Sequence, residues 1–113
     1  MFNHEKFEAY HLSIKFWESA LKLLEQFPSG NSVVKDQLKR AAASIPLNIA
    51  EGSGRTKTDD RKRFYAIARG SVLESAAILD LLVRLEPKLL EQIKHSKEEL
   101  RSIANILSAV ILG

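Results

Sequence analysis

Apolar residues recur at spacings of three and four in four stretches of the chain, and no stretch alternates between apolar and polar residues as a strand does. The first stretch has its apolar seam at Tyr10, Ile14, Trp17, Leu21 and Leu24. The second has one apolar side, made of Val34, Leu38, Ala41, Ile45, Ile49 and Gly52. The pattern predicts four amphipathic helices, each with one side in a shared core.

Turn-forming residues separate these stretches. Pro28 and Gly30 end the first helix, because proline disfavours a helical residue before it and glycine suits a turn. We expect Ser32 to cap the second helix and Thr58 to cap the third, since a hydroxyl at that position accepts a bond from a free backbone amide. Pro87 marks the last break.

The start of the fourth helix has two interpretations. Ser96 and Glu99 have the spacing of a capping box, so a short helix could precede the main one there. The alternative is one continuous helix through Ser96. In either case, short connections between four helices predict a single all-α domain over residues 1–113, an antiparallel up-down-up-down four-helix bundle with Leu38 and Ile45 in its core.

Composition narrows the class of protein. Hydrophobic residues make up 45% of the 113 positions and charged residues 27%, the balance of a soluble globular domain. The absence of cysteine excludes a disulfide scaffold, a thiol nucleophile and a cysteine-based metal site. The longest nearly apolar run, 103–112, falls short of the roughly 20 residues of a membrane span, and the charged N-terminal stretch is not typical of a signal peptide. We therefore expect a cytoplasmic protein that does not bind membranes.

Two stretches are more apolar than a monomeric bundle needs. Residues 72–83 and 103–112 carry apolar side chains almost all round their helices. Such a helix must be covered on more than one side, and in a chain this small we expect the second cover to be another subunit. The sequence thus predicts a homo-oligomer with both stretches in or near its interface.

The second helix also carries a narrow polar stripe opposite its apolar side. At about 100° per residue, the stripe consists of Arg40, Ser44, Asn48, Glu51 and Arg55. Pro46 should kink this helix, and Gly70 in the third helix indicates close contact with a neighbouring helix. We also expect Arg40 to pair with Glu74. The stripe and Glu74 form either a structural polar network or the lining of a groove for a partner, and the small residues around them favour the structural interpretation.

These segments carry a resemblance to a known family. The matching positions are 37–40, 43–55, 67–71, Trp17, Phe27, Pro28 and Glu74. They resemble the signature of a bacterial four-helix-bundle family that is encoded in intervening sequences of 23S ribosomal RNA genes. The resemblance covers nearly the whole chain and implies an antiparallel four-helix bundle that assembles as a ring-like homopentamer.

This family is in turn distantly similar to the accessory variability proteins of diversity-generating retroelements. Those proteins bind nucleic acid and a reverse transcriptase, so the likeness implies both as partners of this chain. The genomic setting of the family favours RNA over DNA.

The charge distribution also indicates a nucleic-acid partner. Residues 35–69 hold nine basic and four acidic residues, although the net charge of the whole chain is only +3. The candidate binding residues surround the corner between the second and third helices: Arg55, Lys57, Arg61, Lys62, Arg63 and Tyr65. Guanidinium groups pair with phosphates, and an exposed tyrosine can stack on an unpaired base. The alternative is that the basic residues only solubilise the start of the third helix, with Phe64 in the core.

Other chemistry has little support in the sequence. His4, Glu8 and His11 could form a metal trio on an extended first helix, but surface histidines at a frayed terminus are the simpler interpretation. The glycine-rich segment 52–55 lacks the lysine and hydroxyl that end a nucleotide-binding loop. We therefore expect no catalytic residue, no metal and no cofactor.

The sequence predicts a non-enzymatic, oligomeric accessory protein that associates with nucleic acid. The alternative is a scaffold or protein-interaction module whose basic surface only keeps it in solution.

Overall fold

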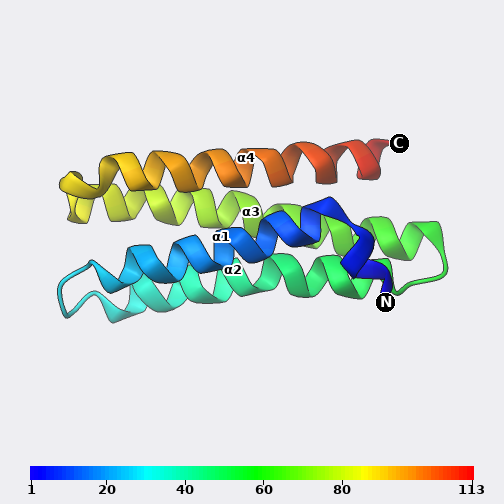
Figure 1. Ribbon diagram of the computed structural model, residues 1–113, viewed down its shortest axis with the longest axis horizontal. Helices are drawn as coiled ribbons and strands as arrows, with labels where there is room; N and C mark the ends of the chain where they lie inside the picture. Colours follow the sequence, from blue (N-terminus) through cyan, green and yellow to red (C-terminus); the bar gives the residue numbers. More distant parts are fainter.

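Four long helices pack side by side in the computed structural model, which describes all of residues 1–113. They are α1 (Glu8–Glu25), α2 (Ser32–Ser53), α3 (Thr58–Leu85) and α4 (Leu90–Leu112). Two short 3-10 helices, η1 (Asn3–Lys6) and η2 (Pro87–Leu89), precede α1 and α4. Consecutive helices run in opposite directions (Figure 1). The predicted all-α four-helix bundle is confirmed.

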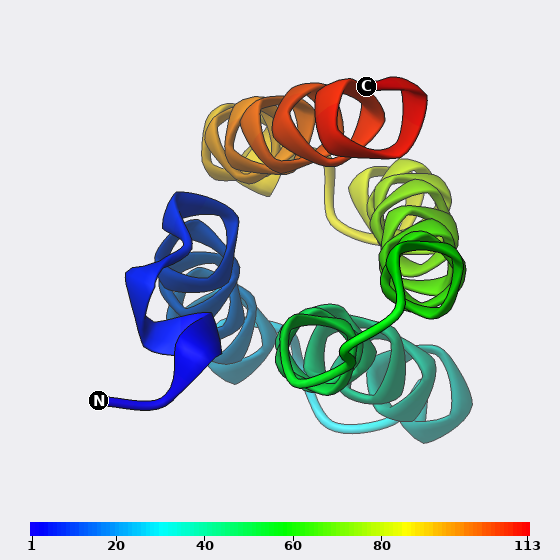
Figure 2. The ribbon, with the colours of Figure 1, turned by 90° about the vertical axis from the view of Figure 1, so that its right-hand side faces the viewer.

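The bundle is elongated, with extents of 45 × 21 × 20 Å. Both chain termini lie at the same end as the α2–α3 loop, and the other two connections lie at the opposite end (Figures 1 and 2). This topology brings η1 against the end of α2, where the Asn3 side-chain amide donates to the Ser53 carbonyl at 3.3 Å. None of the helices combines the length and the hydropathy that crossing a membrane requires.

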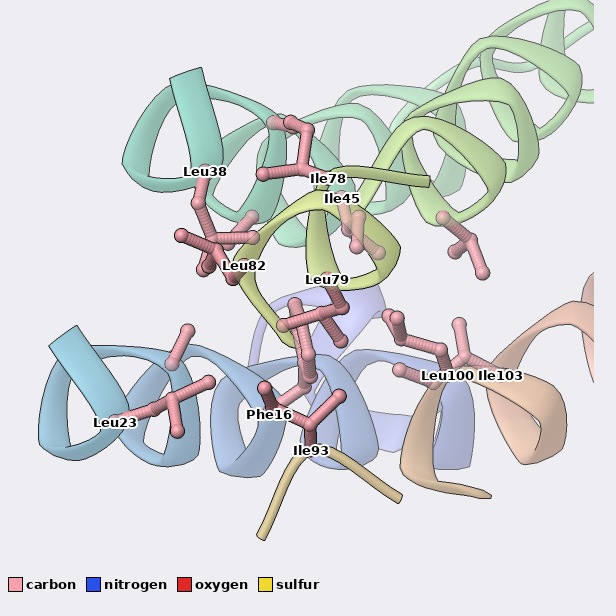
Figure 3. Close-up of a cluster of buried hydrophobic side chains, with 14 of the residues drawn as sticks. Phe16, Leu23, Leu38, Ile45, Ile78, Leu79, Leu82, Ile93, Leu100 and Ile103 are labelled. Carbon is pink, nitrogen blue, oxygen red and sulfur yellow. The ribbon is translucent and has the colours of Figure 1, made fainter. Parts of the chain in front are cut away.

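An apolar core of 21 buried residues runs along the bundle axis. All four helices contribute to it, for example through Phe16, Leu79 and Leu100 (Figure 3). Leu38 and Ile45, the two residues predicted for the core, are fully buried. Burial of these large side chains is the main favourable term that holds the helices together.

The predicted seam of the first helix is displaced by one position. The buried residues of α1 are Ala9, Ser13, Phe16, Ala20, Leu23 and Leu24. Of the predicted seam only Leu24 is buried, whereas Tyr10 and Trp17 pack half-buried at the edge of the core. The predicted and the observed seams have the same spacing of three and four residues. Three of the buried positions carry small side chains, so a pattern based on bulky apolar residues does not detect the observed seam.

The predicted helix caps are wrong, although the breaks lie where expected. α2 begins at Ser32 itself, and its N-cap is Asn31 in the left-handed conformation with φ 56°. α3 begins at Thr58, with Lys57 as its N-cap. Each predicted hydroxyl lies one position inside its helix, and neither actual N-cap makes a side-chain capping bond.

Two helices run without interruption through residues that could break them. α2 continues through Pro46, which is buried. α4 continues through Ser96, whose side chain is also buried, and η2 accommodates the turn at Pro87. Of the two interpretations of the fourth helix, the continuous one is therefore correct.

Candidate nucleic-acid interface

The six predicted binding residues lie at the end of the bundle where α2 joins α3. Four of them, Arg55, Arg61, Lys62 and Tyr65, line one hollow with a volume of about 710 Å³. Arg63 and Lys57 are exposed outside this hollow. Because α3 turns by about 100° per residue, its consecutive basic residues cannot all face the same way. The predicted cluster is thus divided between the hollow and the surface beside it.

The hollow has walls from four parts of the chain. Lys6 and Phe7 come from η1 and the residue after it, and Val110 comes from the C-terminal end of α4. The α2–α3 loop and the first turns of α3 complete it. Its lining includes four cationic side chains, Lys6, Arg55, Arg61 and Lys62, and no carboxylate. The surface therefore attracts anions, most strongly at low ionic strength.

Arg61 holds the loop in place. Its Nε donates to the Arg55 carbonyl at 2.9 Å, and its Nη2 donates to the Thr56 carbonyl at 3.4 Å. These bonds satisfy two carbonyls of a loop that has no regular structure of its own. Arg61 is therefore a positioning residue as well as a cation of the hollow.

Phe64 anchors two further guanidinium groups. The Cζ atoms of Arg55 and Arg63 lie 4.7 and 4.6 Å from the centre of its ring. Arg55 also pairs with Glu51, with 3.1 Å between Nη2 and Oε2, but this pair is exposed and contributes little to stability. The alternative interpretation of the basic run placed Phe64 in the core; the ring is instead half-buried beneath these two arginines. Cation–π contacts hold both guanidinium groups at the corner.

Close packing between α2 and α3 fixes Tyr65. A Cβ atom on Gly52 would lie 2.9 Å from the Tyr65 ring and 3.0 Å from the Phe64 Cβ, so only glycine fits at this position. The Tyr65 hydroxyl and the Ser53 hydroxyl are 3.0 Å apart, and the Phe7 ring packs 5.5 Å from the Tyr65 ring. Tyr65 is therefore a fixed, half-buried wall of the hollow.

Sequence reasoning missed Lys6, Phe7 and Val110 as parts of this site. One signal could have found them: in an up-down-up-down bundle both termini lie at the same end as the second connection. A cation near the N-terminus belongs by that argument to the same cluster as those of the α2–α3 loop.

The polar stripe of α2 forms two separate sets of contacts. The Asn48 side-chain amide donates to the Ser44 carbonyl at 2.8 Å and to its hydroxyl at 2.9 Å, and the Ser71 hydroxyl of α3 donates to the Ser44 hydroxyl at 2.8 Å. The Glu51–Arg55 pair forms the second set. Ser44 and Ser71 thus join α2 to α3 across their contact.

The other contacts expected around the stripe are absent. The predicted Arg40–Glu74 pair is wrong, because both side chains are exposed and neither takes part in an ion pair. The close helix contact expected at Gly70 is also wrong, since a Cβ atom there would meet nothing within 4 Å. Gly52, not Gly70, is the glycine that helix packing requires.

The three candidate metal ligands at the N-terminus do not come together. A 3-10 turn, not an extended first helix, carries His4, so the spacing that would align it with Glu8 and His11 is lost. The His11 Nε2 lies 2.6 Å from the Glu5 carbonyl, and the His4 ring packs edge-on against Tyr10. No group of three His, Cys, Asp or Glu residues is placed to hold a metal ion.

Exposed apolar side chains gather on α2 and α3. They are Val33, Leu47, Ile67, Leu73, Leu81 and Leu85, each at least 44% exposed. The second stretch predicted for an interface is largely covered within the chain: Ile103 and Leu107 are in the core, and Ile106 packs against it. In the first predicted stretch, 72–83, Val72, Ile78, Leu79 and Leu82 are buried as well, and only Leu73 and Leu81 of its large apolar side chains are exposed.

Comparisons with known proteins identify the family. The model of the 23S rRNA-intervening sequence protein family matches residues 5–109. A solved structure, a protein of unknown function of the S23 ribosomal protein family from Bacteroides thetaiotaomicron, is similar with a TM-score of 0.79 and 24% identity over 91% of this chain and 97% of that one. At this identity the likeness shows the fold alone, and no curated protein matches the chain. The match over nearly the full length shows that the chain belongs to the 23S rRNA-intervening sequence protein family.

Proposed function

We propose that the chain is a non-enzymatic protein that binds nucleic acid, RNA in the first place, through the basic corner, which we define as Lys6, Arg55, Lys57, Arg61, Lys62 and Arg63. One observation carries the proposal: cations from three separate parts of the chain meet around a hollow that no carboxylate lines. Phosphates that displace counterions at such a surface supply affinity without a reaction. The setting of the family in 23S rRNA genes supports RNA over DNA.

The proposal includes no reaction. Neither the matching family nor the similar solved structure is described by a catalytic activity. The polar side chains of the corner also support a non-enzymatic function, because the contacts that they make hold the loop and the aromatic rings in place.

The test removes three cations that form no ion pair and leaves Arg61, which holds the loop. In a triple variant, Lys57, Lys62 and Arg63 are replaced by alanine, because none of them makes an ion pair. Binding of labelled single-stranded RNA should weaken strongly, and the slope of log K against log salt should become shallower by about 2, at roughly 0.7 for each lost phosphate contact.

A matched control removes as much charge elsewhere. Lys15, Lys22 and Lys39 are exposed and free of ion pairs, and they lie on α1 and α2 away from the basic corner. Their replacement by alanine should change RNA binding much less than the triple variant does. Equal losses in the two variants would show that net charge, and not this surface, determines binding.

The exposed apolar side chains of α2 and α3 support a second proposal, that the chain self-associates through this face as a scaffold. Leu47 and Leu81 are 68% and 53% exposed, and contact with a second subunit would remove such large apolar side chains from water. The resemblance implies a pentamer, in which the basic corner would repeat around an axis and multiply a weak contact. Light scattering should find an oligomer for the wild type and a monomer for a Leu47→Gln/Leu81→Gln variant. A monomeric wild type at micromolar concentration would contradict self-association.

A further inference from the structure

The hollow at the basic corner has the size of a small-molecule site. Its volume of about 710 Å³ lies within the range of about 300–1,000 Å³ that is typical of ligand pockets. It is built from segments at both ends of the sequence, and the Asn3–Ser53 and Tyr65–Ser53 hydrogen bonds join these segments. The hollow is therefore a defined feature of the folded chain.

The cations of the hollow differ in how far they are already engaged. Arg55 pairs with Glu51, and Arg61 donates to two loop carbonyls. Lys6 and Lys62 make no ion pair. Glu5 of η1, Asp59 and Asp60 of α3 and the neighbouring Glu8 do not line the hollow. Two free ammonium groups without a competing carboxylate suit a phosphate group.

The other walls suit a nucleoside. Phe7, Tyr65 and Val110 provide apolar and aromatic surface, and the fixed Tyr65 ring loses little freedom when a base packs against it. The lining also includes Thr56 and Thr58, whose hydroxyls are of the kind that bond to a sugar. Cations, hydroxyl-bearing residues and an aromatic wall thus line one open hollow.

We propose that this hollow binds one nucleoside monophosphate unit, with the phosphate between Lys6 and Lys62 and the base against the wall of Phe7 and Tyr65. The inference rests on the proposed function, because a nucleic-acid strand is one molecule that could supply this nucleoside monophosphate unit. A free nucleotide and the terminal nucleotide of a strand share this chemistry, so the experiment separates the two sources.

Isothermal titration calorimetry with the four nucleoside 5′-monophosphates tests the proposal directly. The probes for comparison are adenosine, which lacks the phosphate, and inorganic phosphate, which lacks the nucleoside. Nucleotide binding with a Kd below about 1 mM, at least tenfold tighter than either comparison probe, is the expected result. Absence of nucleotide binding, or equal binding of inorganic phosphate, would overturn the proposal.

Variants place the nucleotide in the hollow. Lys6→Ala and Lys62→Ala should each weaken nucleotide binding about tenfold, the usual order for a charge-assisted hydrogen bond. Lys39→Ala should have no effect, because Lys39 lies about 20 Å along α2 from Ser53. Thr56→Trp fills the hollow from the exposed loop without changing the charge, so it should abolish nucleotide binding. Unchanged binding in Thr56→Trp, with folding verified by circular dichroism, would contradict the assignment.

A comparison of strands identifies the source and separates the two proposals. If the hollow takes the end of a strand, single-stranded RNA with a 5′-phosphate should bind more tightly than the same strand with a 5′-hydroxyl. If the hollow takes a free nucleotide, the two strands should bind equally. Strand binding without nucleotide binding would overturn the proposal that the hollow binds a nucleotide, and it would leave the proposed function in place. Nucleotide binding without strand binding supports the hollow and contradicts the proposed function.

Discussion

Replacement of Gly52 by alanine tests the close packing that shapes the basic corner. In an ordinary helix interior, glycine to alanine stabilises by about 0.5–1 kcal/mol, because alanine loses less backbone entropy on folding. Here the new Cβ would lie 2.9 Å from the Tyr65 Cε1 and 3.0 Å from the Phe64 Cβ. Carbon atoms prefer separations of about 3.5–4.0 Å, so the contact must open by roughly half an ångström or more.

Neither contacting group can move away freely. The Phe64 Cβ is attached directly to the α3 backbone, and the Tyr65 ring is held by the Ser53 hydroxyl and the Phe7 ring. α2 and α3 must therefore separate at this end. Overpacking of this kind costs about 1–3 kcal/mol, which outweighs the gain in helix propensity and leaves a net loss of about 1–2 kcal/mol.

Urea unfolding followed by far-UV circular dichroism measures this loss. With a slope of about 1–1.5 kcal/mol per molar urea, the midpoint should fall by about 1 M. Gly54→Ala is the control, because its Cβ would have only ordinary contacts at 3.7 Å and its backbone is helical, and it should change stability by less than about 0.5 kcal/mol. A Gly52→Ala variant as stable as the wild type would refute the packing argument.

Three further predictions concern the interior and the open face of the bundle. Ile45→Ala should lower the free energy of unfolding by about 2–5 kcal/mol, because Ile45 is fully buried. Ser75→Ala should raise it by about 1 kcal/mol, since the buried Ser75 hydroxyl has no hydrogen-bond partner, whereas Ser71→Ala should lower it by a similar amount through loss of the bond to Ser44. Gly70→Ala should raise it by about 0.5–1 kcal/mol at a concentration where wild type and variant are monomeric. Urea titrations measure the free energy of unfolding of each variant. A change of the opposite sign would contradict the burial of Ile45, the hydrogen-bonding assigned to the two serines or the open space at Gly70, respectively.

The fold could be predicted from the sequence because helix periodicity and turn residues report on local structure. Leu38 and Ile45 repeat with the period of a helix side, and the breaks at Pro28 and Pro87 need only local chemistry. The seam of α1 was missed by one position, since Ala9, Ser13 and Ala20 are small and carry little apolar signal.

The site was predicted only in part because it depends on contacts between distant segments. The position of Lys6 beside the α2–α3 loop depends on the topology of the whole bundle. The roles of the two glycines could not be read from helix propensity, which treats Gly52 and Gly70 alike, whereas only Gly52 faces another helix. The Arg40–Glu74 pair failed for a similar reason, since a shared helix interface does not require two exposed side chains to meet.

Fluorescence anisotropy of labelled nucleic acids, titrated with protein that is free of co-purified nucleic acid, measures whether the basic corner binds a strand. Single- and double-stranded RNA and DNA should be compared at several salt concentrations. We expect micromolar or tighter binding that is strongest for RNA and weakens steeply as salt rises. Absence of binding to all four ligands at low salt would contradict this expectation and leave self-association through α2 and α3 as the function to pursue.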